Sequence, residues 1–163
     1  MNFGEIHRES MVDGPGVRVS VFVSGCPHHC PGCFNEELWD YEAGKPFTFA
    51  DELSIMKAAE PDYIAGLTVL GGEPLAPHNR RDVLNLCQHF KKRFPDKTVW
   101  LYTGYTWEWV KDMIGMEYVD VLVDGRFVEA EKDLTLKFRG SRNQRIIDVQ
   151  ASKNEKNLTI WEE

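Results

Sequence analysis

Short apolar segments alternate with segments of helical periodicity up to about residue 125. Residues 17–24 are mostly β-branched or aromatic, which is typical of a strand buried on both faces. In residues 79–94, apolar side chains recur every three or four positions, which predicts a helix with one buried face. The same patterns predict further strands at 67–70, 98–103 and 119–123, and further helices at 48–60 and 106–114.

This alternation predicts parallel strands joined by right-handed crossovers. A closed eight-stranded barrel of this kind usually needs about 250 residues, whereas the chain has 163. We therefore expect an α/β fold in one domain, residues 1–163, with four to five mostly parallel strands in a partial (incomplete) β/α barrel or an open sheet. Residues 145–151 and 158–161 are candidates for additional strands.

The residues with unusual chemistry directly follow the expected strands. Parallel α/β folds bind their ligands at the carboxyl ends of the strands, which meet at one edge of the sheet. The segments at these ends are Ser24-Gly25-Cys26, Gly71-Gly72-Glu73, Thr103-Gly104-Tyr105 and Asp124-Gly125. We therefore expect one functional site where the four segments converge.

Composition and charge narrow the classes of partner. The chain carries 19 Lys and Arg against 26 Asp and Glu, a net charge of −7, which disfavours binding to nucleic acid through its phosphates. Residues 1–10 hold no apolar segment of the kind found in secretory signals, and the longest uncharged stretch, 19–35, is interrupted by two prolines. These features predict a cytoplasmic protein that binds neither membrane nor nucleic acid. Four cysteines in a reducing compartment favour a metal site over disulfides.

Three of the cysteines, Cys26, Cys30 and Cys33, form a C-x3-C-x2-C loop, for which two kinds of metal site compete. Zinc usually takes four ligands, and His28 or His29 could complete the set, although zinc sites are usually built from two separated ligand pairs. A 4Fe-4S cluster presents four irons that each take one external ligand, so three cysteines leave one iron free to bind a substrate. In this second interpretation both histidines lie beside the cluster and are not ligands.

The fourth cysteine, Cys87, lies on the apolar face of the expected helix 79–94. A buried cysteine in such a position behaves as a small hydrophobic residue. We therefore interpret Cys87 as part of the core.

The cysteine spacing, with Phe34 after the last cysteine, resembles the signature of radical S-adenosylmethionine enzymes. The longer stretch at residues 12–35, VDGPGVRVSVFVSGCPHHCPGCFN, resembles the activases of glycyl-radical enzymes. One branch of that family, the activating proteins of anaerobic, class III, ribonucleoside-triphosphate reductases, is similar in four later segments: GGEPL (71–75), YTGYTWE (102–108), VDVLVDGRF (119–127) and RGSRNQR (139–145). The resemblance covers residues 2–149 with similar spacing.

The resemblance implies an enzyme that reductively cleaves S-adenosylmethionine at a 4Fe-4S cluster and takes a hydrogen atom from a glycine of the anaerobic ribonucleoside-triphosphate reductase. The electron would come from a one-electron donor such as flavodoxin. The implied cluster ligands are Cys26, Cys30 and Cys33. The implied S-adenosylmethionine contacts are Gly71, Gly72 and Glu73, with Glu73 on the amino group, the backbone of Gly32, Cys33 and Phe34 at the adenine, and Asp124. No further catalytic side chain is implied.

Two other functions stay open at this point. One is a small radical S-adenosylmethionine enzyme that acts on a free metabolite, and the other is a zinc-stabilised binding module without catalysis. A short chain with an open sheet edge encloses a small molecule poorly, which favours a protein substrate. At two positions an ordinary structural explanation also fits: Asp124-Gly125 suits a turn, and residues 139–145 suit either a contact with partner or cofactor or a basic surface loop.

Overall fold

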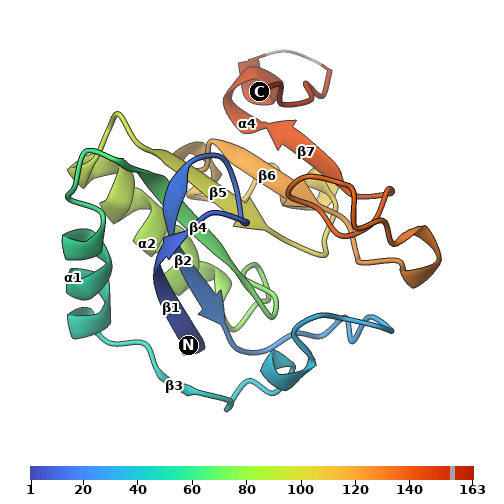
Figure 1. Ribbon diagram of the computed structural model, residues 1–163, viewed down its shortest axis with the longest axis horizontal. Helices are drawn as coiled ribbons and strands as arrows, with labels where there is room; N and C mark the ends of the chain where they lie inside the picture. Colours follow the sequence, from blue (N-terminus) through green and yellow to red (C-terminus); the bar gives the residue numbers. More distant parts are fainter. Residues whose placement is uncertain (155–156) are drawn as a thin grey trace.

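The computed structural model describes residues 1–154 and 157–163, and its described strands form a seven-stranded sheet (Figure 1). The order across the sheet is β3-β1-β2-β4-β5-β6-β7. The central strands β2, β4, β5 and β6 run parallel, whereas β1, β3 and β7 pair antiparallel with their neighbours. The strand bounds are β1 Asn2–Ser10, β2 Val17–Val23, β3 Lys45–Pro46, β4 Ile64–Gly71, β5 Thr98–Tyr102, β6 Val121–Asp124 and β7 Arg145–Asp148.

Helices connect the parallel strands and pack on one face of the sheet. The α-helices are α1 Phe49–Ala58, α2 Arg80–Arg93, α3 Trp107–Val110 and α4 Val149–Asn154, with short 3-10 helices at Glu36–Leu38, Met116–Tyr118 and Glu129–Glu131. Helix α1 begins with a capping box, in which the Thr48 hydroxyl accepts from the Asp51 backbone N–H and the Asp51 carboxylate accepts from the Thr48 backbone N–H. Both contacts satisfy N–H groups that the first turn of a helix leaves free.

The main hydrophobic core lies between the helices and one face of the sheet. It takes alternate residues of β2, namely Val19, Val21 and Val23, together with Ile55 of α1 and Phe90 of α2, all of which are fully buried. The period of two in β2 is the period of side chains that share one face of a strand. A smaller cluster on the other face is built on Trp100, Val121 and Val123, with Phe138 and Trp161 packed against them.

On this second face, a buried arginine links three of the parallel strands through hydrogen bonds. Arg18 is fully buried, and its five hydrogen bonds all go to neutral oxygens: the Thr68 and Thr98 hydroxyls and the carbonyls of Pro15, Leu67 and Thr98. The guanidinium also lies over the Trp100 ring, 5.8 Å from the ring centroid. Burial lowers the pKa of Arg18 to about 10, so the group is still charged at neutral pH.

The expected alternation of parallel strands and helices is confirmed, but the expected number of strands is wrong. The structure has seven strands among the described residues, of which three are antiparallel, where four to five mostly parallel strands were expected. The missed strand β1 is half-exposed, so polar residues fill one face and its segment lacks the continuous apolar character of a doubly buried strand. Closure into a partial barrel stays a prediction.

Three segments differ from the expected elements. The helix expected at 106–114 is limited to α3, Trp107–Val110. The strand expected at 145–151 ends at Asp148, and helix α4 follows directly. The strand expected at 158–161 is reduced to a single antiparallel bridge between Ile160 and Ile147 of β7.

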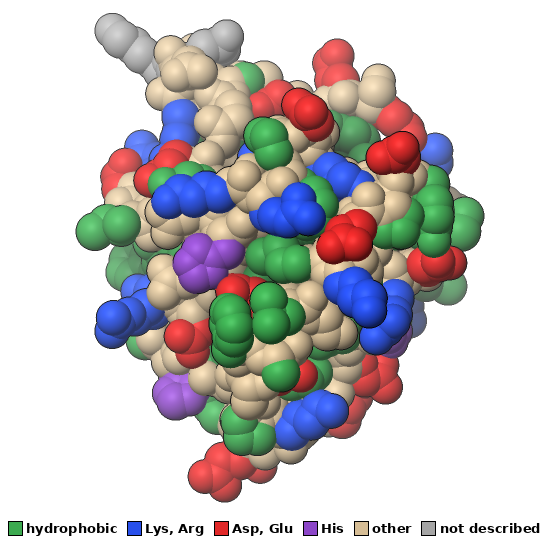
Figure 2. Space-filling view, turned by 90° about the vertical axis from the view of Figure 1, so that its left-hand side faces the viewer, with side chains coloured by type: hydrophobic (Ala, Val, Ile, Leu, Met, Phe, Trp, Pro, Cys, Tyr) green, Lys and Arg blue, Asp and Glu red, His purple; other side chains and the backbone are tan. Residues whose placement is uncertain are grey.

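The surface over α1 carries basic and acidic side chains interspersed with each other, with small apolar islands between them (Figure 2). No helix in the described part of the chain is long and apolar enough to cross a membrane.

Candidate functional site

The register of the parallel strands aligns their carboxyl ends, as the sequence predicts. Val23 of β2 pairs with Gly71 of β4, and Tyr102 of β5 pairs with Val123 of β6. Backbone hydrogen bonds continue beyond the strands, from Gly72 N–H to the Val23 carbonyl at 2.8 Å. The segments that follow β2, β4 and β5 therefore lie at one edge of the sheet.

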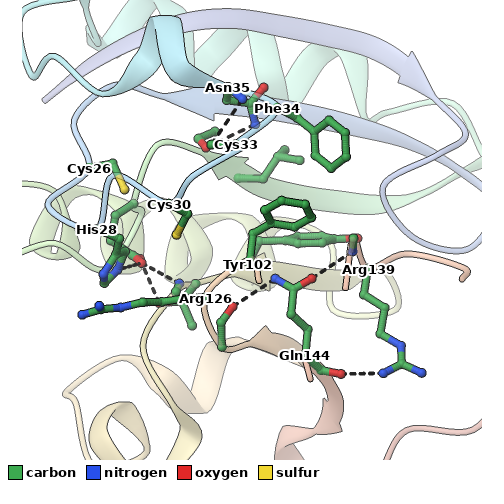
Figure 3. A pocket seen from close by; sticks show the side chains of 18 of the residues that line it. Cys26, His28, Cys30, Cys33, Phe34, Asn35, Tyr102, Arg126, Arg139 and Gln144 are labelled. Carbon is green, nitrogen blue, oxygen red and sulfur yellow. Dashed lines mark hydrogen bonds and ion pairs between the residues drawn. The ribbon is translucent and has the colours of Figure 1, made fainter. Parts of the chain in front are cut away.

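A cavity of about 460 Å³ opens at this edge. One wall is the loop after β2, which carries the three clustered cysteines, and the floor includes Leu70–Glu73 and Tyr102–Gly104. The opposite wall comes from the segment between β6 and β7, through Arg126, Phe127, Phe138, Arg139, Gly140 and Gln144. Figure 3 shows Cys26, Cys30 and His28 on one side of this pocket and Arg139 and Gln144 on the other.

The three clustered cysteines are free thiols that line this cavity together. Cys26 is buried, whereas Cys30 and Cys33 are partly exposed. Burial raises the pKa of the Cys26 and Cys30 thiols above the ordinary value. The start of the loop is fixed by hydrogen bonds from Gly25 N–H to the Leu38 carbonyl at 2.7 Å and from Cys26 N–H to the Trp39 carbonyl at 3.0 Å.

The donor set fits a 4Fe-4S cluster. Each iron of such a cluster takes its own ligand, so the three thiols need only surround a shared space. Hydrogen-bond donors around the sulfurs are a regular feature of these sites. Asn35 N–H already donates to the Cys33 sulfur at 3.4 Å, and the buried indole nitrogen of Trp39, also in the cavity lining, has no partner within the described residues. Across the described ranges, no group of three or more His, Cys, Asp or Glu side chains is placed to hold a single metal ion.

Glu73 is fully buried at the floor of the cavity, and both of its carboxylate oxygens are hydrogen-bonded. Oε2 accepts from Leu75 N–H at 2.8 Å and from the Thr103 hydroxyl at 2.8 Å. Oε1 accepts from Gly104 N–H at 2.6 Å and lies 2.7 Å from Nε2 of His28. These contacts fix the position of a negative charge inside the cavity.

The glycines before Glu73 are required by the packing of the backbone itself. Gly71 has a φ of +114°, in the left-handed region that side chains disfavour. A Cβ on Gly72 would lie 2.6 Å from the Gly25 carbonyl oxygen. The turn after β4 therefore packs directly against the start of the cysteine loop, and close approach to a ligand stays a prediction.

Most of the residues predicted for the site lie together, and two do not. The lining of the cavity includes Cys26, Cys30, Cys33, Phe34, Gly71, Gly72 and Glu73. Gly32 lies outside the lining, where its Cβ position faces the Glu129 carboxyl group at 3.0 Å. Asp124 also lies outside it, because its buried carboxylate accepts from Trp107 N–H at 2.8 Å and pairs with Arg145 at 2.6 Å.

The structure adds residues that sequence reasoning did not assign to the site. His28 and Thr103 contact Glu73, and the buried Asn79 amide donates to the carbonyls of Ser24 and Glu73 at 2.9 and 3.0 Å. The position of Thr103 directly after a strand could have indicated a role at the site. Asn79 gave no such indication, because an asparagine at the start of a helix is an ordinary capping residue. Asn79 is the N-cap residue of α2, but its side chain makes no capping hydrogen bond and donates to the strand-end turns instead.

The motif at residues 139–145 folds on itself and also lines the cavity. Arg139 donates to the Gln144 carbonyl at 2.6 Å, and the Gln144 side-chain oxygen accepts from the N–H groups of Gly140 and Ser141. The Tyr102 hydroxyl donates to the Phe138 carbonyl at 2.7 Å, which ties this segment to β5. The segment is therefore an ordered wall of the cavity.

Comparison with known proteins defines the class of the chain first. The family of 4Fe-4S single cluster domains matches residues 12–147, which include all three clustered cysteines.

Curated relatives then identify the family more closely. The anaerobic ribonucleoside-triphosphate reductase-activating protein of Enterobacteria phage T4 is 43% identical over 148 residues, which cover 90% of this chain and 93% of that protein. The proteins of the same description from Escherichia coli (strain K12) and Vibrio cholerae are 40% and 41% identical, each over 88% of this chain and 96% of their own length. The chain belongs to the family of anaerobic ribonucleoside-triphosphate reductase-activating proteins. The resemblance drawn from the motifs is confirmed at this level.

Proposed function

We propose that this chain is the radical S-adenosylmethionine activase of an anaerobic ribonucleoside-triphosphate reductase. The observation that carries the proposal is the shared cavity, into which three free thiols and one buried carboxylate project. Thiols suit iron, and a carboxylate suits the ammonium of an amino acid. A site that places these groups in one cavity is suited to a cluster and an amino-acid-bearing cofactor together.

The cluster and cofactor would supply the redox chemistry. Held by Cys26, Cys30 and Cys33, the cluster would supply the single electron needed to cleave the sulfonium C–S bond of S-adenosylmethionine. The overall reaction would convert S-adenosylmethionine and the reductase glycine, with that electron, to methionine, 5′-deoxyadenosine and a glycyl radical. A one-electron donor such as flavodoxin would restore the cluster.

The residues of this chain hold and orient these groups. Cys26, Cys30 and Cys33 would bind three irons, and Glu73 would accept from the cofactor's ammonium. The backbone at 32–34 stays our prediction for the adenine contact. Asp124 also stays a prediction, although its bonds to Arg145 and Trp107 favour a structural role. Free thiols at the site suit a reducing compartment, which supports the cytoplasmic location we propose.

The decisive experiment measures hydrogen transfer from the partner. The iron-reconstituted protein is mixed anaerobically with S-adenosylmethionine, a reductant and the reductase labelled with deuterium at its radical glycine. We expect a glycyl radical doublet in the electron paramagnetic resonance spectrum and deuterium in the 5′-deoxyadenosine. Cleavage should be slow without the reductase, because the target C–H must first be positioned at the cofactor.

Two outcomes would contradict the proposal in different ways. Cleavage at equal rates with and without the reductase, and no deuterium in the product, would indicate a radical enzyme that acts on a free metabolite. A colourless protein that binds one zinc ion and no iron would indicate a binding module. The Cys26→Ala variant is the negative control, since it lacks one of the proposed cluster ligands.

A further inference from the structure

The carboxylate of Glu73 has no free acceptor position. A carboxylate offers about four lone-pair sites, two on each oxygen. In Glu73 two donors bond to Oε2 and two to Oε1, at distances between 2.6 and 2.8 Å. An ammonium group could bond to Glu73 only if one of these donors left.

Three of the four donors are held in place by the fold. The donors of Leu75 and Gly104 are backbone N–H groups, and the Thr103 hydroxyl is also held by the Tyr105 N–H, which donates to it at 3.1 Å. The fourth donor, His28, reaches Glu73 only through its side chain, from the loop between Cys26 and Cys30. Rotation about the side-chain bonds of His28 would therefore free one site on Oε1 without breaking the backbone structure.

His28 also fills part of the cavity. Its side chain is only 4% exposed, and its ring lies edge-on to Tyr105 with 4.7 Å between the ring centroids. His28 and Glu73 both line the cavity in which we place the cofactor. The imidazole therefore occupies the space directly beside the proposed ammonium partner.

We propose that His28 occupies the ammonium position on Glu73 in the unliganded protein and is displaced when S-adenosylmethionine binds. This inference rests on the proposed function, because it assigns the cofactor's amino group to Glu73. A ligand with an ammonium replaces the lost N–H donor with a charged one. A ligand without it leaves Glu73 bonded to His28 and displaces nothing, so the histidine lowers the affinity for the intact cofactor and not for a ligand without the ammonium.

Gly104 offers an independent way to move the imidazole. A Cβ added at Gly104 would lie 2.5 Å from Cδ2 and 2.7 Å from Nε2 of His28, and its three nearest neighbours are all atoms of that ring. The backbone of Gly104 is not in the left-handed region that side chains disfavour. The Gly104→Ala substitution should therefore push His28 away from Glu73, and its methyl group would itself lie 2.7 Å from the present position of Nε2, where we place the ammonium.

The test compares the affinity of iron-reconstituted variants for S-adenosylmethionine by equilibrium dialysis under argon. We expect His28→Ala to bind it about five- to thirtyfold more tightly, because no donor has to be displaced from the carboxylate. Affinity for 5′-methylthioadenosine, which lacks the amino acid part, should not change. Glu73→Gln should weaken binding of S-adenosylmethionine by roughly ten- to a hundredfold. The exposed His78, which lies outside the cavity lining, provides the matched control, and His78→Ala should bind as the parent does.

A double-mutant cycle tests whether the ammonium takes the position that Nε2 of His28 now holds. Gly104→Ala should weaken binding of S-adenosylmethionine both in the parent protein and in the His28→Ala background, because its Cβ would lie 2.7 Å from an ammonium at that position. Equally tight binding by His28→Ala with and without Gly104→Ala would show that the ammonium lies elsewhere and would overturn the inference. Iron content per chain confirms that each variant retains the cluster.

Failure of the proposed function and failure of the inference about His28 give different results. If the parent protein does not bind S-adenosylmethionine, the proposed function fails. If the parent binds it and His28→Ala, with its cluster intact, binds equally or less tightly, the inference about His28 is wrong and His28 instead supports Glu73. A parallel gain for 5′-methylthioadenosine would also overturn it, because the effect would then not depend on the ammonium.

Discussion

At the scale of single residues, the four cysteines fall into two environments with different chemistry. Cys26, Cys30 and Cys33 line the cavity, whereas Cys87 is fully buried on α2 within the main core. Burial raises the pKa of the Cys87 thiol to about 12, so at neutral pH it is protonated and unreactive. The position of a thiol in the fold therefore decides whether it can bind iron.

We expect Cys87→Ala to retain the iron content of the parent protein, because a core thiol contributes only packing. Each of Cys26→Ala, Cys30→Ala and Cys33→Ala should lose the cluster. In the iron-free protein at pH 8, iodoacetamide should modify three thiols and leave Cys87 unmodified, as measured by mass spectrometry. Loss of iron in Cys87→Ala would show that a fourth thiol takes part in the site.

The sequence predicts individual site residues where a local motif marks them. The spacing of Cys26, Cys30 and Cys33 and the position of Glu73 after a strand were sufficient to place them in one site. The alignment of the strand ends predicted that Thr103 and Gly104 would lie near Glu73, but not that the Thr103 hydroxyl and the Gly104 N–H would bond to its oxygens. Likewise, nothing local indicates that the Asp124 carboxylate bonds to Arg145 of another strand.

At the scale of elements, Arg18 joins the starts of three parallel strands. Its bonds reach Thr68 of β4 and Thr98 of β5 from its own position on β2, and it uses all five of its N–H donors. Loss of this side chain would leave several buried oxygens without donors, which costs more than the bonds themselves contribute.

We expect Arg18→Met to lower the free energy of unfolding by about 2–4 kcal/mol, measured as a shift of the urea midpoint under argon. The control is Arg8→Met on β1, where the side chain is exposed and the change should stay within about 0.5 kcal/mol. Equal midpoints for the parent and Arg18→Met would mean that water replaces the guanidinium without cost.

Strands buried on both faces and amphipathic helices were predictable from the sequence, whereas the half-exposed strand β1 was not. The continuous apolar runs predicted all four parallel strands, with bounds within a few residues of those observed. Strand β1 has only two buried residues, Phe3 and Ser10, and carries charged residues such as Glu5 and Arg8, so it was missed. The tail after residue 125 was unclear because its structure depends on contacts with the rest of the chain, such as Tyr102 with Phe138.

At the scale of the whole molecule, one arginine connects three parts of the carboxyl-terminal half. Arg145 of β7 bonds to Asp124 of β6 at 2.6 Å and to Glu108 of α3 at 2.9 Å. The hydrogen bonds from Arg145 lower the pKa of Glu108 below its ordinary value. A carboxylate whose pKa is lower in the folded state adds stability above its unfolded pKa, and this contribution disappears as the pH falls through the folded pKa.

We therefore expect Arg145→Met to destabilise the protein by about 2 kcal/mol at pH 7, mainly because the buried Asp124 loses its charged partner. The difference from the parent should narrow between about pH 5 and pH 3, where the Glu108 contribution is lost from the parent as well. The difference in stability is measured from the urea midpoints of the iron-free parent and variant proteins at both ends of this pH range. A difference that is constant with pH would show that the pair between Arg145 and Glu108 does not contribute.

The two outer edges of the sheet limit how this protein can associate with other chains. Strand β3 consists of Lys45–Pro46 alone, and a lysine and a proline are among the residues that most discourage strand addition. The outer side of β7 already bonds to the chain near Ile160, through Asp148 N–H to the Thr159 carbonyl at 2.9 Å and Trp161 N–H to the Ile146 carbonyl at 2.9 Å. Strand β3 covers β1 only at Asn2 and Phe3, and the remainder of β1 carries charged side chains such as Glu5 and Arg8, which also discourage strand addition. Both edges of the sheet therefore disfavour edge-to-edge association with a second copy of the chain.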